Sequence, residues 1–245
     1  MSPRQRKPTP APEPAPTDPG AVLWTPDLAR GIPTAPLVTV GGLRLVEDGV
    51  KGTASVVPAP WSAAESALRI RMGTTATRHQ FASDFSWYPQ AEPVTEHWYG
   101  MRLWVEEWGG TGWCDQVAWR RDGSNGYANT DVHSGYLWLR RNTTRAAEYR
   151  DGLGLDLMRL APWAKGSQLD LVFRFRWSMD PAKALREAWV NGVQVGRQTT
   201  QNLLEYGIRN RLRIGLYQAS GQPVRQVVYG RVVLGTSYAA VDPAA

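Results

Sequence analysis

Polar and hydrophobic residues alternate along much of this chain, which is the pattern of β-strands with one buried face. In the run 169–177, LDLVFRFRW, every odd-numbered position is hydrophobic. Asn191-Gly192 then lies between AWV and VQV, and two residues that tolerate positive φ at this point predict a tight hairpin. The run 211–217 alternates again, with arginine and tyrosine opposite its hydrophobic residues. These runs predict strands with one face in a core and the other face free for a ligand.

Similar short runs recur throughout the chain, separated by Gly, Pro, Asn or Asp turns. The sequence predicts further strands at 36–40, 43–48, 53–57, 66–72, 78–85, 97–106, 114–119, 135–141, 186–195 and 226–235. Helical periodicity is confined to 146–160 and 181–186. So many short strands predict an all-β fold of two packed antiparallel sheets in a jelly-roll arrangement.

Residues 1–20 differ from the rest, with seven prolines and almost no hydrophobic residues. Such a segment buries too little surface to offset its ordering entropy, so we expect an extended arm. Residues 21–245 could form one large β-sandwich or two small domains, and the unbroken series of strands favours one. We expect a soluble protein without a membrane segment or secretion signal, because no apolar run approaches about 18 residues and the N-terminus lacks a signal-peptide core.

Composition limits the chemistry. Cys114 is the single cysteine, which excludes an intramolecular disulfide and a cysteine-cluster metal site. The formal charge is 28 − 22 = +6, and the basic residues are almost all arginine. Arginine binds carboxylates and phosphates through paired hydrogen bonds, so an acidic glycan is a permitted partner. The same bias also follows from a GC-rich genome, and arginines spread along strands argue against a nucleic-acid binder.

The order of the strand runs resembles the polysaccharide lyases with a concanavalin-A-like jelly roll, the alginate-lyase and heparin-lyase-like families. The matching pieces are ALRIRMGTTATRHQFASDF, HWYGMRLWVEEW, DQVAW, LDLVFRFRWS with AWVNGVQV, RLRIGLYQ and VVYGRVVLG. The resemblance covers roughly residues 40–236. Because it consists mainly of strand patterns and a hairpin, it implies a fold more strongly than an activity.

The resemblance also implies where catalytic residues would stand. A β-eliminating lyase needs a cationic or amide group on the uronate carboxylate, a base, and an acid for the leaving oxygen. The family places these groups in an R-x-E-L strand, a Q-I-H strand and a Y-F-K-x-G-x-Y strand. Here Arg78, Gln116, Gly215 and Tyr217 are kept, and Arg213 lies two residues before Gly215 in the third strand. Gln80 replaces the acidic residue, Ala118 replaces the histidine and Arg211 replaces the first tyrosine.

Other residues could supply the missing proton transfer. His79 or His133 is a possible base and Tyr217 a possible acid, if the fold brings them within reach of one point. The commoner role of such histidines is structural: His133 precedes a strand in a turn, and His97 opens a strand. An active lyase therefore requires Arg78, Gln116, Arg213 and Tyr217 to line one groove with a histidine, of which His79 is favoured.

Tryptophans suggest a second kind of contact surface, since indole rings stack on sugars. In 97–105 the alternation places Trp98, Arg102 and Trp104 opposite the hydrophobic residues, so we expect these three to face outward and, with Arg211, to bind glycan or a neighbouring subunit. Large sandwiches also use tryptophan as core, and we assign Trp177 and Trp189 to the core.

The loop 120–135 is rich in oxygen ligands. Asp122, Asn125, Asn129 and Asp131 do not match the calcium-loop spacing, so we expect a hydrogen-bonded surface loop and no metal. No phosphate-binding glycine loop or nucleophile elbow appears, and we expect no cofactor.

Three functions remain open. The first is a non-catalytic structural or adhesive module, in the form of a phage virion protein whose residues 1–20 contact other subunits. The second is an active polysaccharide lyase acting by β-elimination on an acidic glycan. The third is an intracellular carbohydrate-binding protein. The lost family positions favour the first.

Overall fold

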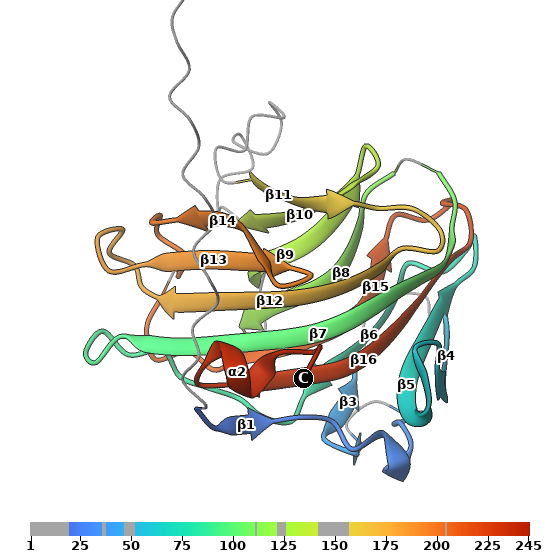
Figure 1. Cartoon of the computed structure of the whole chain (residues 1–245), viewed down its shortest axis with the longest axis horizontal. Coiled ribbons are helices and arrows are strands. Elements are labelled where there is room, and N and C mark those ends of the chain that lie inside the picture. Colours follow the sequence, from blue (N-terminus) through green and yellow to red (C-terminus); the bar gives the residue numbers. More distant parts are fainter. Residues whose placement is uncertain are drawn as a thin grey trace, which may run out of the picture.

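Two antiparallel β-sheets pack face to face in the computed structural model (Figure 1). It describes residues 20–245 except 36–37, 47–51, 111, 122–125, 142–156 and 204. The predicted arm, residues 1–20, therefore lies outside the described residues apart from its last one.

Sheet A has the order β14-β13-β12-β7-β16-β5-β4, and β1 pairs with β16. Its strands are β1 (Val22–Trp24), β4 (Thr53–Ala59), β5 (Ser62–Met72), β7 (Thr95–Trp108), β12 (Gln168–Trp177), β13 (Leu185–Val190), β14 (Val193–Gln198) and β16 (Arg225–Gly235).

Sheet B has the order β11-β10-β9-β8-β15-β6-β3-β2. Its strands are β2 (Thr39–Val40), β3 (Leu43–Leu45), β6 (Arg78–Ser83), β8 (Cys114–Arg121), β9 (Gly126–His133), β10 (Tyr136–Arg141), β11 (Leu157–Pro162) and β15 (Asn210–Gln218). A short 3-10 helix, η1 (Leu28–Arg30), and the C-terminal helix α2 (Tyr238–Val241) complete the described elements. Neighbours in each sheet are often distant in sequence, as the predicted jelly roll requires.

The main core lies between the sheets and confirms the alternation of β12. Leu171, Phe173, Phe175 and Trp177 are fully buried, and the rings of Phe175 and Trp177 stack with their centroids 4.5 Å apart. Trp119 from sheet B packs 4.7 Å from Phe175, so aromatic rings join the two sheets. Burial of large aromatic side chains of this kind dominates the stability of a sandwich.

The predicted hairpin is also confirmed. Asn191 and Gly192 have φ values of 51° and 79°, and they join β13 to β14 with Val190 opposite Val193. Two successive positive φ values match the right-handed twist of the flanking strands, which is why Asn-Gly is favoured here.

Three local predictions are wrong. Residues 157–160 form part of β11, and the rest of the expected helix 146–160 lies outside the described residues. Residues 181–186 form a turn and the start of β13, where Leu185 pairs with Arg176. Residues 126–133, expected as loop, form β9. In the parts of these segments that are strands, ladder hydrogen bonds override weak local propensity.

Helix α2 covers part of the outer face of sheet A (Figure 1). Tyr238 and Val241 pack on Trp98, Val172 and Trp189 in a second hydrophobic cluster. A side chain on Gly100 of β7 would lie 1.7 Å from the Val241 carbonyl oxygen, so the glycine is what allows the helix backbone to sit on the strand. Within the described ranges, no helix is long and apolar enough to cross a membrane.

Candidate active site

Arg78 and Tyr217 form a close pair on the outer face of sheet B. They stand directly opposite each other on the neighbouring strands β6 and β15. The Arg78 guanidinium carbon lies 3.9 Å from the centroid of the Tyr217 ring, a cation–π contact. Burial lowers the pKa of Arg78, and the positive charge of Arg120 lowers it further. An arginine still keeps its charge under these conditions, so the pair presents a fixed cation beside a phenol.

Trp113 contacts Tyr217 as well. It comes from the loop between β7 and β8, and its ring meets the tyrosine ring edge-on with the centroids 5.0 Å apart. Arg78 and Trp113 thus both restrict the orientation of the Tyr217 ring.

The strands bulge beside this pair. The register between β15 and β8 shifts between Ile214 and Tyr217, and Gly215 has a φ of 123°. A side chain at Gly215 would lie 2.3 Å from the His79 carbonyl oxygen, so the bulge requires glycine. The β8 register against β9 shifts around Gln116, and the Tyr229 hydroxyl of sheet A donates to the Gln116 carbonyl at 3.3 Å. Bulges of this type re-aim side chains and are frequent beside active sites.

Two buried amides flank the bulge. Gln80 lies opposite Gly215 and is 1% exposed, and Gln116 is fully buried. Among the described residues, the side-chain oxygen and nitrogen of Gln80 have no hydrogen-bond partner, and the Gln116 Oε1 has none either. The Gln116 Nε2 donates to the Cys114 carbonyl. An unsatisfied buried amide costs about 1–3 kcal/mol, and a polar ligand that supplies the missing bonds would recover that cost.

Arginine dominates the outward positions of sheet B. They follow from the alternation of each strand and include Arg44, Arg78, Arg120, Arg140, Arg159, Arg211 and Arg213. The acidic residues at described outward positions of these strands are Asp115 and Asp131, and both pair with Arg140 at 3.7 and 3.2 Å. The outer face of sheet B is therefore positively charged and suited to an acidic polymer.

The sequence-predicted catalytic residues are only partly brought together. Arg78, Arg213 and Tyr217 share the outer face, and Gln116 lies buried in the adjacent bulge. The expectation for His79 is wrong in its placement: it alternates with Arg78 and its ring packs 5.3 Å from Phe81, on the core side of β6. Gln80 stands where the lyase families have an acidic residue, and it lies on β6 opposite Gly215, beside Arg78 and Tyr217. The sequence prediction did not include it among the site residues.

Arg211 does not offer a free ligand-binding group. It is 9% exposed, and its Nη1 donates to the Ser83 carbonyl at 2.9 Å. The end of β6 thus holds the Arg211 guanidinium, and its expected glycan or interface contact stays a prediction.

The surroundings of the His97 side chain are described, whereas those of the His133 side chain are not. His97 lies within β7 under Trp87, whose ring centroid is 5.2 Å away, and burial lowers its pKa to about 4. It is thus a neutral structural residue at pH 7. His133 ends β9, and its side chain lies outside the described part of the molecule.

Trp98 and Trp104 lie on the predicted face of their strand, but Trp98 is not exposed to solvent as expected. Trp98 and Trp104 lie on the outer face of sheet A, yet Trp98 is 3% exposed because α2 covers it, and Trp104 packs on a small cluster around Val228. Trp177 is in the main core as expected. Trp189, also expected there, lies instead in the outer cluster beneath α2.

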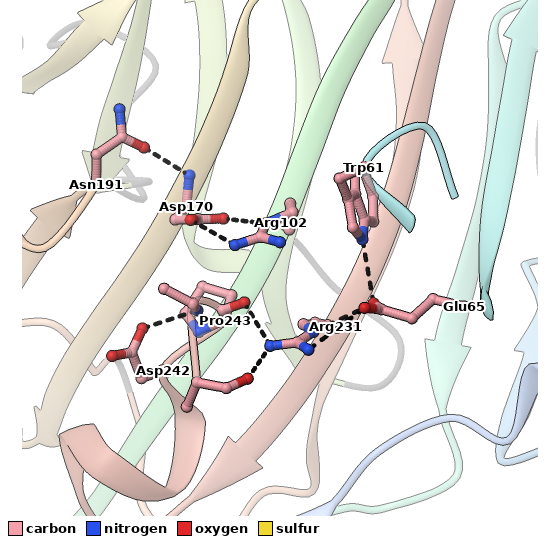
Figure 2. A network of polar contacts seen from close by, with 10 residues as sticks. Trp61, Glu65, Arg102, Asp170, Asn191, Arg231, Asp242 and Pro243 are labelled. Carbon is pink, nitrogen blue, oxygen red and sulfur yellow. Dashed lines mark hydrogen bonds and ion pairs between the residues drawn. The ribbon is translucent and has the colours of Figure 1, made fainter. Parts of the chain in front are cut away.

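Arg102 belongs to an ion-paired network on this face (Figure 2). Its Nε and Nη2 donate to both oxygens of Asp170 at 2.5 and 2.8 Å. Arg231 similarly contacts Glu65 at 3.2 Å and the Pro243 carbonyl at 2.9 Å. The charge of Arg102 is thus already paired, and its expected glycan contact stays a prediction.

Of the four oxygen-bearing residues in the predicted loop 120–135, only Asp131 has a described side chain. Asp131 lies on β9 and pairs with Arg140, Asn129 has a described backbone only, and Asp122 and Asn125 lie outside the described residues. Among the described residues, no group of three or more His, Cys, Asp or Glu side chains could hold a metal ion. Cys114 is buried, which raises the pKa of its thiol to about 12.

Comparison with known proteins agrees with this architecture. No family model and no curated protein sequence matches the chain. Among solved structures, an endo-β-1,4-glucuronan lyase from the fungus Trichoderma reesei aligns with a TM-score of 0.64 at 18% identity, over 81% of this chain and 92% of that one. The fold is that of polysaccharide lyases.

Two alginate lyases support the same conclusion. One from polysaccharide lyase family 7 has a TM-score of 0.52 at 9% identity, over 73% of this chain and 81% of its own. One from Corynebacterium sp. has a TM-score of 0.51 at 10% identity, over 73% and 79%. At these identities the similarity establishes the lyase-like jelly roll.

Proposed function

We propose that this protein is a polysaccharide lyase that cleaves an acidic, uronate-containing glycan by β-elimination on the outer face of sheet B. The observation that carries the proposal is the Arg78–Tyr217 pair, with its 3.9 Å contact, on an arginine-rich face of a lyase-type fold. Of the three functions open from the sequence, this geometry favours the lyase over the non-catalytic module.

The reaction needs a stabilised negative charge. When the carbon beside the uronate carboxylate loses its proton, charge moves onto the carboxylate oxygens, and a fixed cation or amide donor lowers the barrier. Arg78 supplies the cation in a largely buried setting, where a charge interacts strongly. Gln80, next along the same face of β6, supplies an amide without a competing protein partner in the described part of the chain.

The proton transfers require one group at the same point. The Tyr217 phenolic oxygen takes the proton from the carbon beside the carboxylate. The bond from the neighbouring carbon to the glycosidic oxygen then breaks, a double bond forms between the two carbons, and the phenol returns the proton to the leaving oxygen. Asp115, a nearby alternative, is occupied by Arg140 at 3.7 Å. Tyr217 therefore replaces the histidine base that the sequence suggested.

The arginines of the face define the substrate class. A neutral polysaccharide offers nothing for Arg78, Arg120 and Arg213, whereas a polyuronate offers one carboxylate per sugar. We expect activity on polymers such as alginate, glucuronan, heparin-type or bacterial capsular glycans, and no cleavage of neutral glucans.

The test is incubation of the purified full chain with each polymer while absorbance is followed at about 235 nm, where an unsaturated uronate absorbs; the Tyr217→Phe variant removes the proton-transfer group and serves as the control. A product signal that disappears in Tyr217→Phe supports the proposal. Binding of a polyuronate without any product would instead support the non-catalytic glycan-binding module. The contact of residues 1–20 with assembly subunits stays a separate prediction.

A further inference from the structure

Arg225 is a fully buried cation at the start of β16. Its alternation with Val227 and Tyr229 places it on the inner side of sheet A. Its guanidinium donates to neutral oxygens on three sides: the carbonyls of Gly109 (3.3 Å), Gly112 (2.7 Å) and Trp113 (3.1 Å), and the side-chain oxygens of Gln218 (3.2 Å) and Gln222 (3.3 Å).

These contacts are unusual for a residue that only fills space. A buried cation loses its hydration, at a cost of several kcal/mol, and within the described residues no carboxylate forms an ion pair with Arg225. The planar fork of arginine instead matches several carbonyl acceptors that face one point. The Trp108 ring lies 4.5 Å below the guanidinium carbon and covers it. The arrangement therefore holds the backbone carbonyls of Gly109, Gly112 and Trp113, between β7 and β8.

That loop carries Trp113 to Tyr217. The carbonyl of Trp113 is bound by Arg225, while its ring contacts Tyr217 at 5.0 Å. Arg225 also binds Gln218, the residue that follows Tyr217 on β15. From the opposite sheet, one guanidinium thus binds both the residue whose ring packs on Tyr217 and the side chain of the residue that follows Tyr217 in the chain.

We propose that Arg225 is a positioning residue for Tyr217, acting through Trp113 and Gln218. This inference rests on the proposed lyase function for its catalytic consequence, but its structural part does not. Misplacing a reacting group by about 1 Å can cost up to about a hundredfold in rate, so loss of the guanidinium should lower kcat more than substrate binding.

The kinetic test compares Arg225→Met and Arg225→Lys with the same substitutions at Arg231. Arg231 lies on the same strand but binds Glu65 on the outer face of sheet A, so it controls for loss of a β16 arginine. We expect Arg225→Met to reduce kcat by at least about tenfold with KM changed less than about twofold, and Arg225→Lys to recover part of the loss. Arg231→Met should keep kcat. Combining Arg225→Met with Trp113→Ala should add little to the loss from Trp113→Ala alone, since both act on one path.

A second readout needs no activity. In protein labelled with fluorotryptophan, the Trp113→Phe variant assigns the Trp113 fluorine resonance. That resonance should shift or broaden in Arg225→Lys and stay in place in Arg231→Lys.

An unchanged resonance, or an unchanged kcat in folded Arg225→Met, would overturn the positioning role. If the wild-type protein cleaves no polymer, the lyase proposal fails, and the fluorine spectra alone decide whether Arg225 fixes Trp113.

Discussion

The two outer faces of the sandwich use arginine in opposite ways. On sheet A, five arginines pair with carboxylates: Arg69 with Glu106, Arg102 with Asp170, Arg174 with Glu96 and Glu187, Arg197 with Glu187, and Arg231 with Glu65. On sheet B, the described outward arginines greatly outnumber the two aspartates, which both pair with Arg140. On the first face most arginines are ion-paired, whereas on the second the surplus of arginine leaves a positive charge.

This difference separates structural arginines from functional ones. The outward arginines of both sheets occupy the polar positions of alternating strands, so neither residue type nor position in the alternation distinguishes them. What differs is the balance between arginines and carboxylates on each face. On sheet A, carboxylates bind five arginines and contribute to the sheet, as cross-strand pairs do. On sheet B, the described outward arginines outnumber the acids and leave a net positive charge.

The largest effect is expected at Tyr217. Replacing Tyr217 with Phe removes the proton-transfer group but keeps the ring between Arg78 and Trp113, so product formation should fall by about 10³-fold. The unfolding free energy should change by less than about 1 kcal/mol. Initial rates at about 235 nm and urea unfolding measure both, because the elimination product absorbs there. Tyr136→Phe, on β10 of the same sheet, should retain most activity; equal losses in the two variants would argue against the assignment.

Arg78 and Arg102 give the most direct contrast between the faces. Arg78→Met should lower kcat/KM by about 10²-fold, since the carboxylate loses its cation in the transition state. Arg102→Met should leave kcat/KM within about twofold, because Asp170 already neutralises that guanidinium. Steady-state kinetics on a polyuronate decides the matter, and a larger loss in Arg102→Met would reverse our assignment of the two faces.

The ion pair of Arg102 and Asp170 should appear in stability instead. A double-mutant cycle with Arg102→Met and Asp170→Asn should give a coupling free energy of about 1 kcal/mol, the value for a partly exposed bidentate pair. The two side chains are 13% and 16% exposed, so we do not expect the larger energies of dry interiors. Chemical denaturation of the wild type, the two single variants and the double variant measures the coupling free energy. A value near zero would show that the Arg102–Asp170 ion pair does not contribute to stability.

The smallest effect is expected at Arg213. Arg213→Gln should raise KM about threefold and leave kcat unchanged, because a surface cation mainly attracts the polymer. The difference from wild type should shrink as salt increases. Arg69→Gln, on sheet A and paired with Glu106, is the matched control and should leave KM unchanged at every salt concentration. A salt-independent change in Arg213→Gln would indicate a direct contact with the reacting sugar.

Much of the fold could be predicted from the sequence, because strand alternation is a local property. The runs that became β12, β15 and the β13–β14 hairpin carry hydrophobic residues at every second position or the Asn-Gly turn, and each was confirmed. The strands β9 and β11 were missed because their segments lack a clear period of two. They became strands through pairing with β10 and, for β9, also with β8.

The site was less predictable for the same physical reason. Alternation correctly placed Trp98 outward, but α2, well over a hundred residues later in the chain, covers it. Arg78 and Tyr217 were identified from the resemblance, yet their contact depends on the β6–β15 register. Arg225 has no sequence motif at all, and only its five acceptors in space distinguish it.

The sequence by itself determined an all-β sandwich, its main hairpin and a surplus of arginine. Those properties follow from side-chain period, turn chemistry and charge, which act within a few residues. The tertiary structure decided which arginines meet a carboxylate, which tryptophans are covered, and that Arg78, Trp113 and Tyr217 meet at one point. These outcomes depend on strand order and register, which bring together residues that no local pattern relates.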